Sequence, residues 1–179
     1  KTGSSTSPFL NTGVMIDSKV YTIKTNPVYK GKEKPLRDIL VDEKNVEEEF
    51  YVNNKDLKKW KYLKNSKQEE RETKDGFKYN YSEGSMIFPD DLDKASRTII
   101  TGEGGSGPSR FKHVIAPPSN PKKLRRLTPI ELERLNMFPD DHTKLENVSN
   151  TKRAFLMGNA LVVGVIKKLG DSLYNFYEK

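Results

Sequence analysis

Near the start of the chain, short apolar runs alternate with turn-forming residues. The runs at 14–16 and 20–23 flank Asp17 and Ser18. Two such runs joined by a two-residue turn are typical of a β-hairpin. Further short runs, at 28–29, 39–41, 50–52 and 77–79, predict more extended pieces. The first part of the chain is therefore expected to be rich in β-structure.

A helical pattern replaces this alternation near residues 56–66. Leu57, Trp60 and Leu63 recur at i, i+3 and i+6, which places them on one helix face. We expect Trp60 in the core. Lysines surround the stripe, at positions 55, 58, 59, 61, 64 and 67. Such a helix suits docking along a phosphate backbone, and a solvated surface helix is the alternative for the lysines.

The last third of the chain has strong helix signals. Thr128, Pro129 and Glu131 form a capping-box sequence, and Phe138-Pro139 ends the helix that they begin. A short helix is expected from Asn150 or Thr151 to Met157, where Gly158-Asn159 interrupts it. Over 160–177 apolar residues repeat every three or four positions, which predicts an amphipathic helix.

A glycine-rich tract, 102–107, follows an apolar run, Arg97–Thr101, that predicts a strand. It is no nucleotide P-loop, because Pro108 stands where that motif requires lysine. Glycines let a backbone approach a ligand or another chain closely. Since Arg97, Arg110 and Lys112 flank the tract, it is interpreted as a loop at a DNA groove. A mobile hairpin tip is the alternative.

The charge and the cysteine content limit the kinds of partner and site that the chain can have. The 179 residues carry 32 Lys+Arg against 25 Asp+Glu, net +7, which favours a polyanionic partner or serves solubility alone. There is no cysteine, so a disulfide, a thiolate metal site and a cysteine nucleophile are excluded. The two histidines, His113 and His142, lie far apart, so no metal site is expected.

The sequence also predicts where the protein is located and whether the chain is part of a longer one. No apolar run approaches the roughly 18 residues that span a bilayer, and no secretory leader pattern is present, so a cytoplasmic protein without a membrane partner is expected. The chain opens with Lys1 rather than methionine, as a trimmed chain or a piece of a longer protein would.

Two ordered motifs carry a family resemblance. Residues 125–140, RRLTPIELERLNMFPD, resemble motif IX of the DNA (cytosine-5) methyltransferases, and 158–161, GNAL, resemble motif X. Upstream, 96–105 is similar to the end of that family's target recognition domain. Ser7-Pro8-Phe9 with 13–15 resembles the segment that leaves the catalytic domain after motif VIII. One departure is Asn136-Met137, where the family usually has glycine before Phe/Tyr-Pro.

The resemblance implies a domain organisation. It makes 1–125 a β-rich target recognition domain, and 126–179 a helical region that packs on a catalytic domain. The expected fold is α+β, with the Rossmann-like catalytic domain absent from the chain. The family's Pro-Cys nucleophile and cofactor glycine loop are missing, so the chain alone is expected to be inactive. Asn159 and Ala160 would contribute one wall of an S-adenosylmethionine pocket that is complete only with the missing half.

The functional expectation is a sequence-specific DNA-recognition portion of a restriction–modification cytosine-5 methyltransferase. Its partners would be double-stranded DNA and a catalytic half, which is part of the same longer chain or a separate subunit. Alternatively, the last helix would cover its apolar face by self-association. A non-enzymatic basic nucleic-acid-binding or assembly module is the rival. Arg125 and Arg126 are expected either to contact phosphates or to brace the recognition domain against the catalytic domain. The candidate DNA-binding residues are Lys58, Lys61, Arg97, Thr98, Ile99, Thr101, Gly102, Gly104, Gly105, Arg110 and Lys112.

Overall fold

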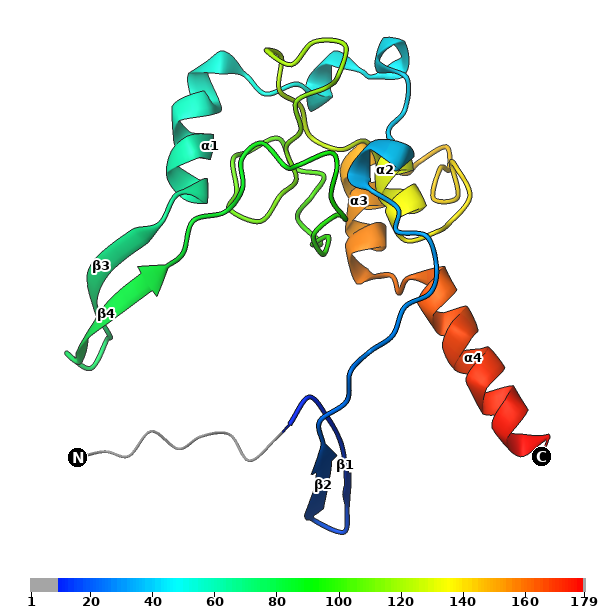
Figure 1. The fold of residues 1–179 in the computed structure, drawn as a ribbon. Coiled ribbons are helices and arrows are strands. Elements are labelled where there is room, and N and C mark those ends of the chain that lie inside the picture. The colour runs from blue at the N-terminus through cyan, green and yellow to red at the C-terminus, as the bar shows by residue number, and fades with distance from the viewer. Residues whose placement is uncertain (1–9, 179) are drawn as a thin grey trace. The chain divides into compact units, whose positions relative to one another are not determined.

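The computed structural model describes residues 10–178, so Ser7, Pro8 and Phe9 lie outside the described residues (Figure 1). The chain forms two compact units, Lys1–Glu33 and Lys34–Lys179. In the first unit, β1 (Thr12–Ile16) pairs antiparallel with β2 (Lys19–Ile23). Asp17 and Ser18 have φ of 47° and 61°, as a two-residue type I′ turn requires. The predicted hairpin is confirmed.

The second unit has more turns and fewer strands than expected. Its elements are four 3₁₀ turns, η1 (Leu36–Ile39), η2 (Glu43–Asn45), η3 (Glu48–Phe50) and η4 (Asn54–Asp56), then α1 (Leu57–Lys64), β3 (Lys67–Glu72), β4 (Lys78–Glu83), α2 (Pro129–Leu135), α3 (Asn150–Asn159) and α4 (Val163–Tyr177). Strands β3 and β4 form an antiparallel two-stranded ribbon. Among residues 10–178 the only sheets are this ribbon and the β1–β2 hairpin. The fold is α+β with C-terminal helices, as predicted.

Four of the expected extended pieces form no strand. Residues 39–41 and 50–52 belong to, or directly follow, 3₁₀ turns, and residues 28–29 and Arg97–Thr101 have no regular structure. In two of these runs, Ile39 and Phe50 are buried as single anchors of turns. Short apolar runs do not distinguish such anchors from strand positions.

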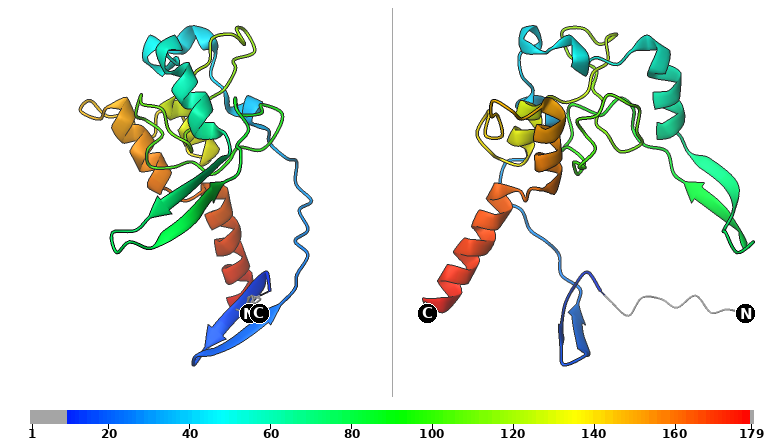
Figure 2. Two further views of the ribbon diagram at one scale, coloured as in Figure 1. Left: turned by 90° about the vertical axis from the view of Figure 1, so that its left-hand side faces the viewer. Right: turned by 180° about the vertical axis from the view of Figure 1, so that it is seen from behind.

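The core of the second unit joins early and late parts of the sequence. Leu36 and Ile39 of η1 pack with Ile115, Leu127, Leu132, Ala154 and Met157. Both η1 and α3 contact α2, and the right-hand view of Figure 2 shows the three elements next to one another. Residues on both sides of position 125 therefore contribute to one core, and the predicted boundary at 125 stays a prediction.

Helix α2 begins and ends as its sequence dictates. The Thr128 hydroxyl accepts from the Glu131 amide, and the Glu131 carboxylate accepts from the Thr128 amide, so the capping box is confirmed. At the other end, the Met137 and Phe138 amides bond to the Arg134 and Glu133 carbonyls in a Schellman motif. Met137 has φ of 64°, in the left-handed region that glycine adopts without strain. This geometry explains why the family usually has glycine at that position.

The last two helices are separate elements. The expected break between them is present, but it falls at Ala160–Val162 instead of Gly158-Asn159, because α3 continues through Asn159. The expected amphipathic helix is confirmed as α4. No α4 residue is buried, and its apolar side chains face solvent. Within residues 10–178, no helix is long and apolar enough to cross a bilayer.

Candidate nucleic-acid interface

The glycine-rich loop, 102–107, is held by two buried cations. The Lys112 ammonium donates to the carbonyls of Gly105 and Gly107, at 2.6 and 2.7 Å. The Arg126 guanidinium donates to the carbonyl of Gly104 at 3.0 Å. Burial, reinforced by Arg126, lowers the pKa of Lys112. Because Lys112 is already engaged with the loop, its predicted DNA contact stays a prediction.

A buried acid–imidazole pair lies beneath the loop. Glu103 accepts from the His113 amide at 3.0 Å, and its other oxygen is 2.9 Å from Nδ1 of the His113 ring. The second ring nitrogen is 3.1 Å from the Ser96 hydroxyl. Sequence reasoning missed Glu103, because a glutamate among glycines resembles a solvated loop residue. Its burial shows that the loop is anchored rather than a free hairpin tip.

The loop also packs directly against α3. A Cβ on Gly104 would lie 2.6 Å from the Cα of Thr151, and a Cβ on Gly158 would lie 2.4 Å from the Thr101 backbone nitrogen. Distances below 3 Å to backbone atoms leave no room for a side chain. Glycine is therefore required at both positions for close backbone approach. The predicted cofactor residues, Asn159 and Ala160, follow this contact directly.

Arg97 and Arg110, the predicted base contacts, are engaged inside the protein. Arg97 forms a two-bond ion pair with Asp90, at 2.7 and 3.1 Å, and its side chain is 29 % exposed. Arg110 donates to the carbonyls of Leu63 and Asn65, at 2.9 and 3.2 Å, and its side chain is 13 % exposed. Their DNA contacts stay predictions, and the structure adds an internal role for each.

Other predicted residues are accessible. Thr98 and Thr101, in the segment that leads into the loop, and Gly102, at its start, are exposed, whereas Ile99 is half-buried and packs on the core. On α1, Lys58 and Lys61 are exposed, and neither forms an ion pair within residues 10–178. Trp60 is buried, as predicted.

Lys64 contradicts the expectation for the lysines around α1. Its side chain is 1 % exposed, and its ammonium donates to the carbonyl of Lys112. Burial, with Arg97 nearby, lowers the pKa of Lys64 to about 8. A phosphate could not reach this ammonium, so Lys64 holds α1 against the segment around Lys112 instead.

Arg125 and Arg126 are interior residues, so the phosphate-contact interpretation is wrong for both. The Arg125 guanidinium is fully buried between Glu131, at 2.8 Å, and Glu43, at 2.6 Å. Burial is the largest single effect and lowers the pKa of Arg125, but the hydrogen bonds that Arg125 donates to Glu131 and Glu43, together with the negative charges of these carboxylates, outweigh it, so the pKa is raised. Arg126 is 3 % exposed and bonds to the glycine loop. Both arginines brace the second unit internally.

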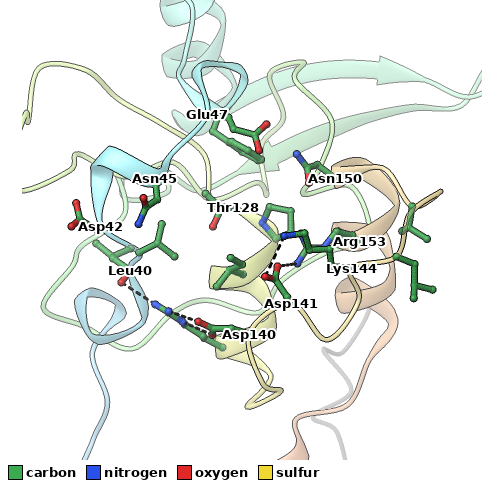
Figure 3. Close-up of a pocket in the computed structure, with 17 residues that line it drawn as sticks. Leu40, Asp42, Asn45, Glu47, Thr128, Asp140, Asp141, Lys144, Asn150 and Arg153 are labelled. Carbon is green, nitrogen blue, oxygen red and sulfur yellow. Dashed lines mark hydrogen bonds and ion pairs between the residues drawn. The ribbon is translucent and has the colours of Figure 1, made fainter.

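Sequence reasoning also missed a cavity of about 670 Å³ between residues 40–50, α2 and 140–153 (Figure 3). Its charged groups are largely paired, with Arg134 bound to Asp140 at 2.7 Å and Arg153 bound to Asp141 at 3.0 Å. Hydrogen bonding to Arg134 lowers the pKa of Asp140. Across residues 10–178, no cluster of three or more His, Cys, Asp or Glu side chains could hold a metal ion.

Comparisons with known proteins agree with the motif resemblance. The family model described as C-5 cytosine-specific DNA methylase matches residues 11–175. The type II methyltransferase M.Sau3AI of Staphylococcus aureus is 41 % identical over 165 residues, covering 92 % of this chain and 38 % of the relative. This chain thus spans less than half of that relative's length. The solved structure of the Entamoeba histolytica methyltransferase EhMeth shares the fold, with a TM-score of 0.60 at 15 % identity, over 87 % of this chain and 45 % of that one.

Together, the match over 11–175 and the identity to M.Sau3AI establish that this chain belongs to the C-5 cytosine-specific DNA methylase family.

Proposed function

We propose that this chain is the DNA-recognition and C-terminal part of a restriction–modification cytosine-5 methyltransferase. In this proposal it binds duplex DNA, and a catalytic half supplies the nucleophile for methyl transfer from S-adenosylmethionine to cytosine C5. The chain contains no cysteine, so it cannot form the covalent bond to the base by itself.

The observation that carries the proposal is a pair of exposed apolar surfaces. On the β1–β2 hairpin, Val14, Met15 and Ile16 are 54–70 % exposed. On α4, Leu169, Leu173 and Phe176 are 56–73 % exposed, as are other apolar residues of that helix. Contiguous exposed apolar surface marks a site that another chain or domain covers. The family resemblance assigns both segments to contact with the catalytic domain, which is the cover we propose.

DNA contacts would be divided between two parts of the second unit. Lys58 and Lys61 on α1 would bind phosphates and set the register of the complex. The exposed residues where the chain enters the loop, Thr98, Thr101 and Gly102, would face the groove. Arg97, Arg110 and Lys112 would hold the neighbouring backbone in place, and a base contact by any of them would require an exchange of its internal bonds.

Asn159 and Ala160 would form only one wall of the cofactor pocket. Asn159 is exposed and its amide donates to the Phe155 carbonyl at 3.0 Å, and Ala160 is half-buried at the end of α3. This small polar edge would complete an S-adenosylmethionine pocket of which the catalytic half supplies the rest. When bound, the cofactor supplies the methyl group.

A double variant tests the DNA-binding part of the proposal. Lys58→Ala/Lys61→Ala should weaken binding to cognate and random duplexes alike, because each lysine neutralises a phosphate without reading sequence. The slope of log K against log salt should fall by about 2. The measurement is a fluorescence-anisotropy titration at several salt concentrations.

Lys167→Ala is the matched control. Lys167 pairs with Asp171 on α4, which lies apart from α1 in Figure 1, so its loss should leave the slope unchanged. Absent or salt-insensitive binding by the parent chain would contradict the proposal. That outcome would instead favour a non-enzymatic assembly module.

A further inference from the structure

The β3–β4 ribbon has two chemically different faces. Directly paired residues of an antiparallel ribbon share a face. The pairs Lys67↔Glu83, Glu69↔Tyr81 and Arg71↔Tyr79 form one face, and Gln68↔Ser82, Glu70↔Asn80 and Glu72↔Lys78 form the other. The six residues of this second face are all exposed, and we call it the amide face.

The first face is occupied by contacts that stiffen the ribbon. The Arg71 guanidinium lies 3.5 Å from the centre of the Tyr81 ring and bonds to Glu69 at 3.0 Å. The Lys67 ammonium lies 4.6 Å from the centre of the Tyr62 ring on α1. Cation–π contacts of this kind attach the ribbon to the helix before it.

Arg110 fixes the root of the ribbon. It bonds to the carbonyls of Leu63 and Asn65, where α1 leads into β3, and to the carbonyl of Gly84, where β4 ends. It also pairs with Glu83 at 3.1 Å. One guanidinium thus holds both strands at their base, and the ribbon projects from the end of α1 as a supported arm (Figure 1).

The amide face holds one ion pair, between Lys78 and Glu70 at 3.4 Å, but its amide and hydroxyl groups are unused. In the described part of the chain, the side chains of Gln68, Asn80 and Ser82 make no hydrogen bond. Asparagine and glutamine can donate to and accept from one adenine edge at once, and the major groove of B-DNA admits a two-stranded ribbon.

The charge of the ribbon disfavours phosphate binding by this segment. Residues 67–83 carry four basic and five acidic side chains, in a protein of net charge +7. A segment with net charge −1 gains nothing from the phosphates, so it would add discrimination rather than affinity. The lysines of α1 would supply the affinity.

We propose that the amide face of the β3–β4 ribbon enters the major groove and reads base edges through Gln68 and Asn80. The inference rests on the proposed function, because it presumes that this chain binds duplex DNA. It adds a second specificity element to the glycine loop, and it makes Arg110 a positioning residue for the ribbon.

The test is binding-site selection from randomised duplexes, with sequencing of the bound pool. The protein is this chain joined to the part of M.Sau3AI that it does not match. Gln68→Ala and Asn80→Ala should each relax preference at one or two base pairs, by about 5- to 150-fold. Affinity for random duplex and melting temperature should stay at the parental values, because both side chains are exposed.

Asn147→Ala is the matched control, since Asn147 is another exposed amide without a hydrogen-bond partner in the described residues. It should keep every parental preference. Unchanged base preferences in both ribbon variants would overturn the inference, whether or not methyl transfer is retained. A parent that binds but selects no sequence would overturn the proposed function, and the ribbon inference with it.

Discussion

Replacing Arg125 by alanine is expected to lower the free energy of unfolding by about 3–5 kcal/mol. Arg125 is fully buried between Glu131 and Glu43, and Glu131 also accepts from the backbone of Val41 and Thr128. Removing the cation leaves buried negative charge without a partner, and that penalty exceeds the Coulomb energy of the pair. Urea denaturation followed by far-UV circular dichroism measures the change.

Lys123→Ala is the comparison for the Arg125 variant. Lys123 also forms an ion pair, with Glu48 at 2.9 Å, but its side chain is 44 % exposed. Exposed pairs contribute less than about 1 kcal/mol, so this variant should be nearly as stable as the parent. Equal losses in the two variants would contradict the assignment of Arg125 as the central brace of the second unit.

Gly158→Ala is expected to destabilise the protein by about 1–3 kcal/mol, although alanine is the better helix former. The intrinsic helical gain is at most about 1 kcal/mol. It is outweighed because the new Cβ would lie 2.4 Å from the Thr101 nitrogen and 2.5 Å from the Ile100 carbonyl carbon. Backbone atoms cannot rotate away, so α3 must separate from the segment that leads into the glycine loop. Thermal unfolding measures the loss, and hydrogen exchange of the Thr101 and Gly102 amides reports the separation.

Gly107→Ala is the matched control for that substitution. A Cβ at Gly107 has no atom within 4 Å, so stability should change by less than about 0.5 kcal/mol. A Gly158→Ala protein as stable as the control would show that the loop and α3 are not in the close contact described. Because Asn159 and Ala160 follow Gly158, the same contact joins the proposed cofactor wall to the proposed recognition loop.

Features that depend on neighbouring residues were predictable from the sequence. The Asp17-Ser18 turn, the capping box of Thr128 and Glu131, and the apolar stripe around Trp60 are each encoded within a few positions. Local hydrogen bonds and helical periodicity decide such elements, so one sequence suffices.

Whether a basic side chain points into the protein or toward solvent was not predictable from the sequence. Arg125 is turned inward by Glu43, 82 positions earlier, and Arg110 by the carbonyl of Leu63, 47 positions earlier. No local pattern distinguishes an arginine with a buried partner from one that faces a phosphate. Arg97 and Arg110, the predicted base contacts, are among the side chains that point inward. The proposed DNA contacts therefore move to Lys58, Lys61 and the exposed residues at the start of the glycine loop.

The low strand content has a similar cause. Ile39 and Phe50 are apolar because they anchor 3₁₀ turns in the core, and the 97–101 segment has no neighbouring strand. Strand formation requires a hydrogen-bonding partner that is distant in sequence, whereas burial of a single side chain requires only a cavity that fits it. The apolar pattern reports burial in both cases.

The measurement that tests the central claim most directly is methyl transfer from labelled S-adenosylmethionine to mixed-sequence duplex DNA. It compares this chain alone, the part of M.Sau3AI that the chain does not match, and the two joined in one polypeptide. The account predicts incorporation of label only by the joined protein, at a defined set of sites. Incorporation by this chain alone would contradict it, as would a folded joined protein that neither methylates DNA nor binds it in a salt-dependent way.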